Sequence, residues 1–200
     1  TLSITRASGW GLSTDERTIA QALKAGGYRT AFVGDWLLGH AKPAFWPTRR
    51  GFDAFYGSLA GTEASLLRKG GKSDWRRGEK AANDAGYVTE LLGREASDVI
   101  RRHDASTPLF LVVAFNAPAR YADVPKSALD AYHDIADDTR RSYAAAVTTM
   151  DTAIGGIVAA LEQRKMLDDT LVVFHSDNGG AIPTRFATGD GDVRSPAADN

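Results

Sequence analysis

Apolar residues recur along this 200-residue chain in two patterns, helical spacing and short continuous runs. Helical spacing marks residues 87–100 and 143–161, where apolar side chains return every three or four positions. Continuous β-branched, aromatic and aliphatic runs fill residues 28–33, 108–115 and 170–174. Apolar strands separated by amphipathic helices are typical of a mostly parallel sheet with helices on both faces. The pattern therefore predicts an α/β fold in which these three strands lie parallel.

The remaining segments carry weaker signals. Residues 13–16 read Ser-Thr-Asp-Glu, which fits a capping box and predicts a helix that ends at Gly26. Residues 40–80 are rich in Arg, Gly and Trp and show no clear period, so we expect an excursion over one edge of the sheet. The periodicity disappears after Gly180, and we expect the domain to continue past the last residue. Residues 1–200 are thus predicted to form one partial domain.

Composition narrows the classes of function. Lys and Arg number 24 against 25 Asp and Glu, and the net charge of -1 gives no broad field that would attract nucleic acid. With no Cys, the chain has no disulfide, thiolate metal site or cysteine nucleophile. No apolar run approaches the roughly 20 residues that span a bilayer, and the first residues lack the layout of a signal peptide. We therefore expect neither a nucleic-acid partner nor a membrane span, and an anion has to be recognised locally.

Polar residues follow each predicted strand, where ligands bind in open α/β sheets. Asp35 follows the first strand, Asn116 the second, and Asp177 with Asn178 the third. The parallel arrangement predicts that all of them face one edge of the sheet. Carboxylate and amide oxygens beside two glycines suit a hard cation such as Ca²⁺, and His40 near the first strand end is a candidate base.

Each of these residues also has a structural interpretation. Asp-Asn-Gly sequences are common turns, and Asp35 is a frequent type of helix N-cap residue. His40 and His175 each stand alone in the sequence and are explained as well by surface or structural hydrogen bonds. Residues 48–50, Thr-Arg-Arg, form either an anion clamp or a solvated basic pair. The residues alone leave these alternatives open.

At the same turns, the chain resembles the sulfatase family of the alkaline-phosphatase superfamily, especially arylsulfatase B-like and bacterial arylsulfatases. The resemblance covers nearly the whole chain and keeps the family's order and approximate spacing. It is carried by residues 11–16 (GLSTDE), 25–30 (AGGYRT), 33–40 (VGDWLLGH), 47–53 (PTRRGFD), 115–118 (FNAP) and 176–180 (SDNGG). Together these segments are highly specific to the family.

The resemblance implies a metal-assisted hydrolysis of sulfuric esters. Such sulfatases use a formylglycine, made from Cys or Ser in a C/S-x-P-x-R motif, whose hydrated form attacks sulfur while Ca²⁺ and several cations hold the sulfate. Two calcium ligands of the family transfer unchanged onto Asp177 and Asn178. The 200 residues contain no C/S-x-P-x-R motif. Because two residues do not supply the six to eight oxygens that Ca²⁺ prefers, we expect weak or absent calcium binding in this chain.

Three catalytic positions depart from the family pattern. Asp35 replaces a sulfate-binding Lys, Leu37 replaces a His, and Ala119 replaces a second His. His40 and Arg120 remain as candidate substrate-binding residues. A carboxylate about 4 Å from sulfate costs roughly 1 kcal/mol even in bulk water. We therefore expect weak sulfate binding at these positions, and a cation at Asp35 in preference to sulfate.

Three functions remain in competition. The first is a sulfuric ester hydrolase acting on a sulfate ester or sulfated glycan, with this chain inactive alone. The second is a non-catalytic, sulfatase-like binding module, which the substitutions at Asp35, Leu37 and Ala119 favour. The third is another phospho- or phosphonate hydrolase of the superfamily, although residues 48–53 fit sulfatases better. By resemblance, the compartment is the periplasm, the exterior or the lysosome.

Overall fold

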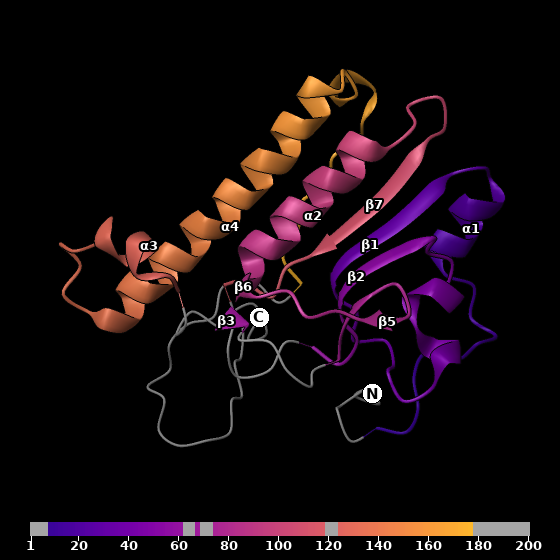
Figure 1. Cartoon of the computed structure of the whole chain (residues 1–200), viewed down its shortest axis with the longest axis horizontal. Coiled ribbons are helices and arrows are strands. Elements are labelled where there is room, and N and C mark those ends of the chain that lie inside the picture. Colours follow the sequence, from indigo (N-terminus) through magenta and orange to yellow (C-terminus); the bar gives the residue numbers. More distant parts are fainter. Residues whose placement is uncertain (1–7, 62–66, 69–73, 119–123, 178–200) are drawn as a thin grey trace, which may run out of the picture. The chain divides into compact units, whose positions relative to one another are not determined.

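The computed structural model describes residues 8–61, 67–68, 74–118 and 124–177. The chain forms two compact units, Thr1–Asp168 and Asp169–Asn200, and each is described by itself. The first unit holds the sheet and its helices (Figure 1).

The core of the first unit is a five-stranded sheet in the order β5-β4-β2-β1-β7. Strand β1 lies parallel to β2 on one side and to β7 on the other, whereas β2 with β4 and β4 with β5 are antiparallel. A separate antiparallel pair joins β3 and β6. The strands are β1 (Arg29–Asp35), β2 (Ala54–Ser58), β3 (Leu67–Arg68), β4 (Trp75–Arg77), β5 (Lys80–Ala81), β6 (Gly86–Tyr87) and β7 (Leu109–Ala114). The predicted α/β class is confirmed, with an antiparallel extension beside β2.

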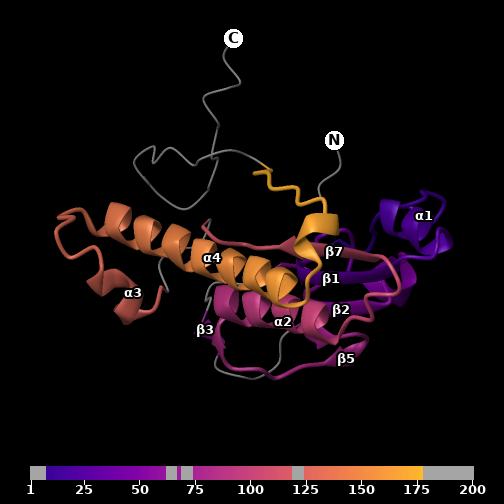
Figure 2. The same cartoon turned by 90° about the horizontal axis from the view of Figure 1, so that it is seen from above.

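Helices cover both faces of the sheet. Helices α2 and α4 pack along each other on one face, as Figure 2 shows, and α1 contributes to the opposite face. The α-helices are α1 (Ile19–Ala25), α2 (Val88–Arg102), α3 (Lys126–Asp130) and α4 (Asp138–Gln163), and the 3₁₀ helices are η1 (Pro43–Phe45), η2 (Pro47–Arg49) and η3 (Leu167–Asp169). The predicted helices at 87–100 and 143–161 are thus confirmed.

Alternation along β1 divides the core into two apolar layers. Val33 packs toward α2 with Tyr56, Trp75 and Leu92, while Phe32 points to the other face. There its ring meets the rings of Trp36, Phe52 and Phe55 at centroid distances of 5.2, 5.3 and 6.0 Å. Both layers are needed because a parallel strand is buried on both sides.

Helix α1 begins later than the sequence pattern predicts. Thr18 is its N-cap and its hydroxyl accepts from the Gln21 N–H at 3.1 Å, while the Gln21 side chain accepts from the Thr18 N–H at 2.9 Å. The predicted cap at Ser13 is wrong, although Ser13 and Glu16 follow the same spacing. The Thr18 hydroxyl in addition donates to the distant Arg50 carbonyl at 2.8 Å, whereas the Ser13 hydroxyl accepts from the nearby Asp15 N–H at 3.3 Å.

Two strand predictions are also wrong. Residues 54–58 form the inner strand β2, which the irregular composition of residues 40–80 concealed. Residues 170–174 form no strand, and the side chains of Leu171, Val173 and Phe174 are exposed. An apolar run becomes a strand only where another strand satisfies its backbone groups. Within residues 169–177 of the second unit no such partner is described.

Helix α4 is the one helix of the described residues that is long and apolar enough to cross a membrane. Its apolar side chains are used in the fold, because α4 packs along α2 and buries Ala145, Ala146, Ala160 and Leu161.

Candidate functional site

Three parallel strands end side by side at one edge of the sheet. Gly34 of β1 is level with Gly57 of β2 and Ala114 of β7, and Asp35 is level with Ser58. Asn116 follows β7 by two residues. The prediction that Asp35 and Asn116 share the carboxyl edge is confirmed. Asp177 belongs to the second unit, so its place at this edge stays a prediction.

Two glycines allow the strands to approach each other closely at this edge. A Cβ on Gly34 would lie 2.0 Å from the Ala114 carbonyl oxygen, and one on Gly57 would lie 1.9 Å from the Gly34 oxygen. Both glycines have a φ that L-residues rarely adopt, 129° and 147°. The chain after β1 is thereby held directly against the chain after β2.

Asp35 faces the segment that follows β2. Its Oδ2 atom lies 3.9 Å from the place of a Cβ on Gly61, and the Leu37 Cδ2 atom lies 3.0 Å from the same point. The Trp36 N–H donates to the Ser58 oxygen at 2.9 Å and the Leu37 N–H to the Leu59 oxygen at 3.1 Å. Asp35 and Leu37 are therefore neighbours at a fixed position beyond β1.

Asp74 holds the segment after β2 in place. The Ser58 hydroxyl lies 2.9 Å from each Asp74 carboxylate oxygen, and the Ala60 N–H donates to one of them at 2.6 Å. The sequence pattern does not predict this contact, because Asp74 directly precedes β4 and is distant in sequence from the turn that it holds. Asp74 is a positioning residue for the loop that borders Asp35.

Leu37 has a backbone conformation that is unusual for its side chain. Its φ is +57°, in the left-handed region, where a bulky residue is uncommon and Asn, Asp and His are several-fold enriched. The Leu37 side chain is nevertheless 49% exposed. A strained, exposed residue at a strand end is typical of a position shaped by function.

His40 and Asn116 are both partly buried at this edge of the sheet. The His40 oxygen accepts from the Trp46 indole N–H at 2.8 Å, and the His40 Nδ1 atom is buried. Both amide atoms of the Asn116 side chain are buried without a hydrogen-bond partner. Leaving such a group unpaired costs about 1–3 kcal/mol. The structure does not explain why the Asn116 side chain is buried without a hydrogen-bond partner.

Arg49 and Arg50 differ in burial and in partners. Arg50 is 2% exposed, and its guanidinium donates to the carbonyl oxygens of Ser13, Thr14 and Glu16 at 2.9, 3.1 and 2.6 Å. Arg49 pairs with Glu79 at 2.8 Å. For Arg50 the anion clamp and its solvated alternative are both wrong, whereas the role of Arg49, whose side chain is 60% exposed, stays a prediction. Each arginine already has acceptors within the protein.

Several predicted site residues lie outside the described part of the chain. Ala119, Arg120 and Asn178 are among them, so their roles stay predictions. Asp177 and His175 are described, and both are exposed in the second unit. Within the described ranges, no three His, Asp or Glu side chains come together as a metal ion would require.

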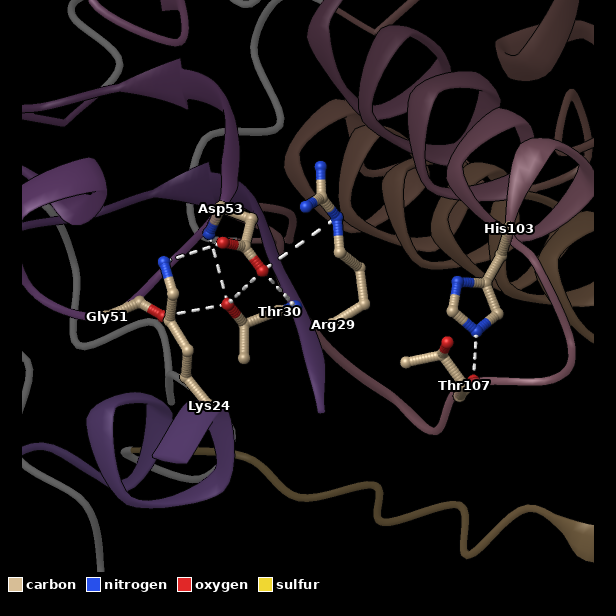
Figure 3. A network of polar contacts seen from close by, with 7 residues as sticks. All are labelled: Lys24, Arg29, Thr30, Gly51, Asp53, His103 and Thr107. Carbon is tan, nitrogen blue, oxygen red and sulfur yellow. Dashed lines mark hydrogen bonds and ion pairs between the residues drawn. The ribbon is translucent and has the colours of Figure 1, made fainter. Parts of the chain in front are cut away.

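The amino edge of the sheet carries a polar network that sequence analysis missed. The Asp53 carboxylate, 14% exposed, accepts from the Thr30 N–H at 3.0 Å and lies 2.6 Å from the Lys24 Nζ and 3.8 Å from the Arg29 Nε (Figure 3). Burial raises the pKa of the Asp53 carboxyl, but the hydrogen bonds and charge of Lys24 and the hydrogen bonds of Thr30 outweigh it, so that pKa is lowered.

A second contact shown in Figure 3 closes the turn before β7. The buried His103 ring lies 2.6 Å from the Thr107 oxygen, and Arg164 donates to the His103 oxygen at 2.8 Å. Since β1 begins at Arg29 and ends at Asp35, the Asp53 network and the Asp35 site lie at opposite ends of one strand. The Asp53 carboxylate has its partners within the protein, which is typical of a structural role.

A cavity of about 310 Å³ lies between α2 and the sheet. Ala31 and Ala54 are register partners on β1 and β2, and their small side chains leave the hollow. Arg77 and Glu95 line the cavity, and the Arg77 Nη1 atom lies 2.5 Å from the Glu95 Oε1 atom. The cavity lies against the face of the sheet and does not coincide with Asp35.

Comparisons with known proteins agree on one family. A family model described as Sulfatase matches residues 1–197. Mouse arylsulfatase J is 33% identical over 178 residues, an alignment that covers 84% of this chain and 30% of the relative. Human N-acetylgalactosamine-6-sulfatase is 30% identical over 188 residues and is covered to 34%. The chain thus spans about a third of the length of these relatives.

Solved structures give the same result for the fold. The crystal structure of Ps i-CgsB in complex with k-i-k-neocarrahexaose superposes with a TM-score of 0.73 at 26% identity. The superposition covers 81% of this chain and 40% of that one. The shared fold and the match over residues 1–197 lead to one assignment: this chain belongs to the sulfatase family.

Proposed function

We propose that this chain is part of a sulfuric ester hydrolase, and that its own residues do not hydrolyse a sulfate ester. Family membership supports the first statement. The second rests on one observation: a carboxylate, Asp35, and an alkyl side chain, Leu37, lie together at the end of β1, where the family resemblance expects a Lys and a His.

The charge of Asp35 acts against sulfate. Two like charges about 4 Å apart repel by roughly 1 kcal/mol in water and by several times more in a drier pocket. A lysine at the same place would attract sulfate by a similar amount, so the substitution changes the sign of the interaction. Leu37 in addition removes a hydrogen-bond donor and a proton source from the same edge.

Sulfated glycans are the proposed substrate class of the whole protein. Human N-acetylgalactosamine-6-sulfatase is one relative, and the neighbour Ps i-CgsB was solved with a neocarrahexaose. Sulfate esters on sugars are therefore the ligands to test first.

Calcium is proposed to bind this chain weakly or not at all. The resemblance assigns two of the chain's residues, Asp177 and Asn178, as calcium ligands. Ca²⁺ prefers six to eight oxygens. A formylglycine nucleophile likewise has no C/S-x-P-x-R motif to arise from within these 200 residues.

The second candidate function is a non-catalytic binding module. The acidic Asp35 favours it, since this residue opposes the binding of the anionic group on which a sulfatase acts.

Calorimetric titration of sulfate and of Ca²⁺ into the wild-type chain, Asp35→Lys and Asp35→Asn tests this proposal. We expect Asp35→Lys to strengthen sulfate binding at least about fivefold, Asp35→Asn to give a smaller gain, and both to weaken Ca²⁺ binding. Asp151→Lys is the control, because it makes the same charge change at an exposed position of α4. Equal responses of Asp35→Lys and Asp151→Lys would remove Asp35 from the site.

A further inference from the structure

Small side chains leave a cavity between α2 and the sheet. Its volume of about 310 Å³ is at the lower end of the roughly 300–1,000 Å³ that is typical of small-molecule sites. Ala31 of β1 and its register partner Ala54 of β2 line it, and Val33 and Val99 add apolar surface. Ala31 is buried whereas Ala54 is exposed, so the cavity opens to solvent. We call it the Ala31 cavity.

An ion pair lines the same cavity. Arg77 of β4 donates from Nη1 to the Glu95 Oε1 atom of α2 at 2.5 Å, and its guanidinium carbon lies 4.3 Å from the centroid of the Tyr56 ring. The hydrogen bond with Glu95 raises the pKa of Arg77 more than burial lowers it, so the guanidinium stays charged. Asp53 also belongs to the lining and is paired with Lys24 at 2.6 Å. The Ala31 cavity thus combines apolar walls with a positive and a negative group that face each other.

This pair of charges selects against charged ligands. An anion that approaches Arg77 is repelled by Glu95, and a cation that approaches Glu95 is repelled by Arg77. The Tyr56 ring does not offer its face to a ligand cation, because the Arg77 guanidinium already stacks there. A purely apolar ligand would take water from the ion pair without replacing its hydrogen bonds.

An uncharged carboxamide satisfies both members of the pair. Its N–H group donates to a carboxylate and its carbonyl oxygen accepts from a guanidinium. A guanidinium has five N–H donors and a carboxylate about four acceptor sites, so Arg77 and Glu95 can bind an amide while they stay paired. We propose that the Ala31 cavity binds a small uncharged molecule in which a carboxamide is attached to an aromatic or branched apolar group. The apolar group packs on Ala31, Val33 and Ala54.

This site goes beyond the proposed function. Ala31 precedes Asp35 by four residues on β1, which is about 13 Å along a strand. The cavity is lined by the face of the sheet and by α2, and its ligand carries no sulfate. Binding at the Ala31 cavity therefore does not depend on whether sulfate binds beside Asp35.

The test is calorimetry of the complete 200-residue chain with three probes of nearly equal size, namely benzamide, benzoate and benzylammonium, at pH 7. Benzamide should bind with a Kd of about 1 mM or tighter. Benzoate and benzylammonium should each bind at least about fivefold more weakly, because each is repelled by one member of the ion pair. A benzamide Kd above 1 mM, or a charged probe that binds within fivefold of benzamide, would overturn the proposal.

Filling the cavity locates the binding. Ala54→Leu should weaken benzamide at least about fivefold, because the larger side chain occupies the mouth of the cavity. Ala81→Leu is the matched control, since Ala81 is an exposed strand residue of β5 outside the lining and should leave the affinity unchanged. Circular dichroism checks that both variants fold. Equal affinities of the two variants for benzamide would show that the probe binds elsewhere and that the inference is wrong.

Removing one charge tests the selection among ligands. Glu95→Gln keeps an acceptor for Arg77 but removes the repulsion of anions, so it should strengthen benzoate binding at least about fivefold relative to benzamide. Glu90→Gln makes the same change at an exposed position of α2 outside the lining and should leave the ratio unchanged. A merely structural role of Glu95 would alter stability without altering this ratio. An unchanged ratio in Glu95→Gln would therefore contradict the inference.

Its failure is distinguishable from failure of the proposed function. Absent benzamide binding would leave the sulfate and Ca²⁺ titrations of the Asp35 variants intact. Turnover of a sulfate ester would contradict the proposed function and leave the comparison of the three probes intact.

Discussion

At the residue scale, the candidate site consists of Asp35, the last residue of β1, and Leu37, two positions later, which both approach Gly61. The backbone there is held by two hydrogen bonds from Trp36 and Leu37 to the chain after β2. The conformation is therefore imposed by the fold and not by the side chain of Leu37. A residue that suits a positive φ poorly is kept in place at a cost of roughly 1–2 kcal/mol.

Leu37→Asn should raise the free energy of unfolding by up to about 1 kcal/mol, because Asn tolerates the left-handed region. Leu38→Asn is the matched control, since Leu38 is similarly exposed at an ordinary φ and should give no gain. Chemical denaturation measures both. A loss of stability in Leu37→Asn equal to that in Leu38→Asn would show that the backbone at position 37 is not strained.

The Asp53 network makes stability depend on pH. The folded-state pKa of Asp53 is lowered from its ordinary value of 3.8, so its stabilising contribution is present above that value and is lost as the pH falls through the lower, folded-state pKa. Asp53→Asn should cost about 1–3 kcal/mol at pH 7. The difference from wild type should shrink below about pH 4.

Urea denaturation at several pH values measures this difference. Asp151→Asn, an exposed substitution on α4, should change stability within about 0.5 kcal/mol at every pH. A pH-independent effect of Asp53→Asn would mean that shape, and not charge, explains the role of Asp53.

At the element scale, the packing of α2 against α4 depends on a close approach at one glycine. A Cβ on Gly93 of α2 would lie 2.7 Å from the Ala153 Cβ atom of α4, whereas a Cβ on Gly155 would meet nothing within 4 Å. The two glycines are both helical and differ in surroundings. Their substitution separates packing from helix propensity.

Gly93→Ala should therefore destabilise the protein by about 1–3 kcal/mol through overpacking, and Gly155→Ala should stabilise it by up to about 1 kcal/mol. Thermal unfolding followed by circular dichroism at 222 nm compares the two variants. The same sign of change in both would contradict the close packing of α2 on α4.

The elements that sequence analysis predicted are those whose pattern is local. Helices α2 and α4 show a periodic apolar face, and β7 is a continuous apolar run. Strand β2 was missed because it is short and lies within a segment rich in arginine and glycine. The cap at Thr18 competes with an equally good pattern at Ser13, and a hydrogen bond from the Thr18 hydroxyl to the distant Arg50 carbonyl is a contact that local sequence does not reveal.

The candidate site was predicted in part, for the same reason. That Asp35 and Asn116 share an edge follows from parallel strands alone. The approach of Asp35 and Leu37 to Gly61, and the support from Asp74, depend on contacts between segments far apart in sequence. The strand predicted at residues 170–174 needed a neighbour that local composition does not reveal.

At the scale of the whole molecule, a sulfatase-family fold carries a carboxylate, Asp35, at the strand end where the resemblance expects a sulfate-binding Lys. The match over residues 1–197 and the superposition on Ps i-CgsB support the fold. The charge of Asp35 is the reason for our proposal that sulfate binds weakly here. The fold of this chain and its proposed lack of sulfate-ester hydrolysis are therefore two separate statements, and each has its own test.

The most direct test of this account is the turnover of 4-nitrocatechol sulfate by the purified chain, with Ca²⁺ present. We predict no hydrolysis above the buffer rate, because the chain lacks the motif for the nucleophile and carries Asp35 and Leu37 in place of a cation and a base. Asp177→Ala, prepared in parallel, distinguishes intrinsic activity from a contaminating enzyme. Turnover that Asp177→Ala abolishes would contradict the account.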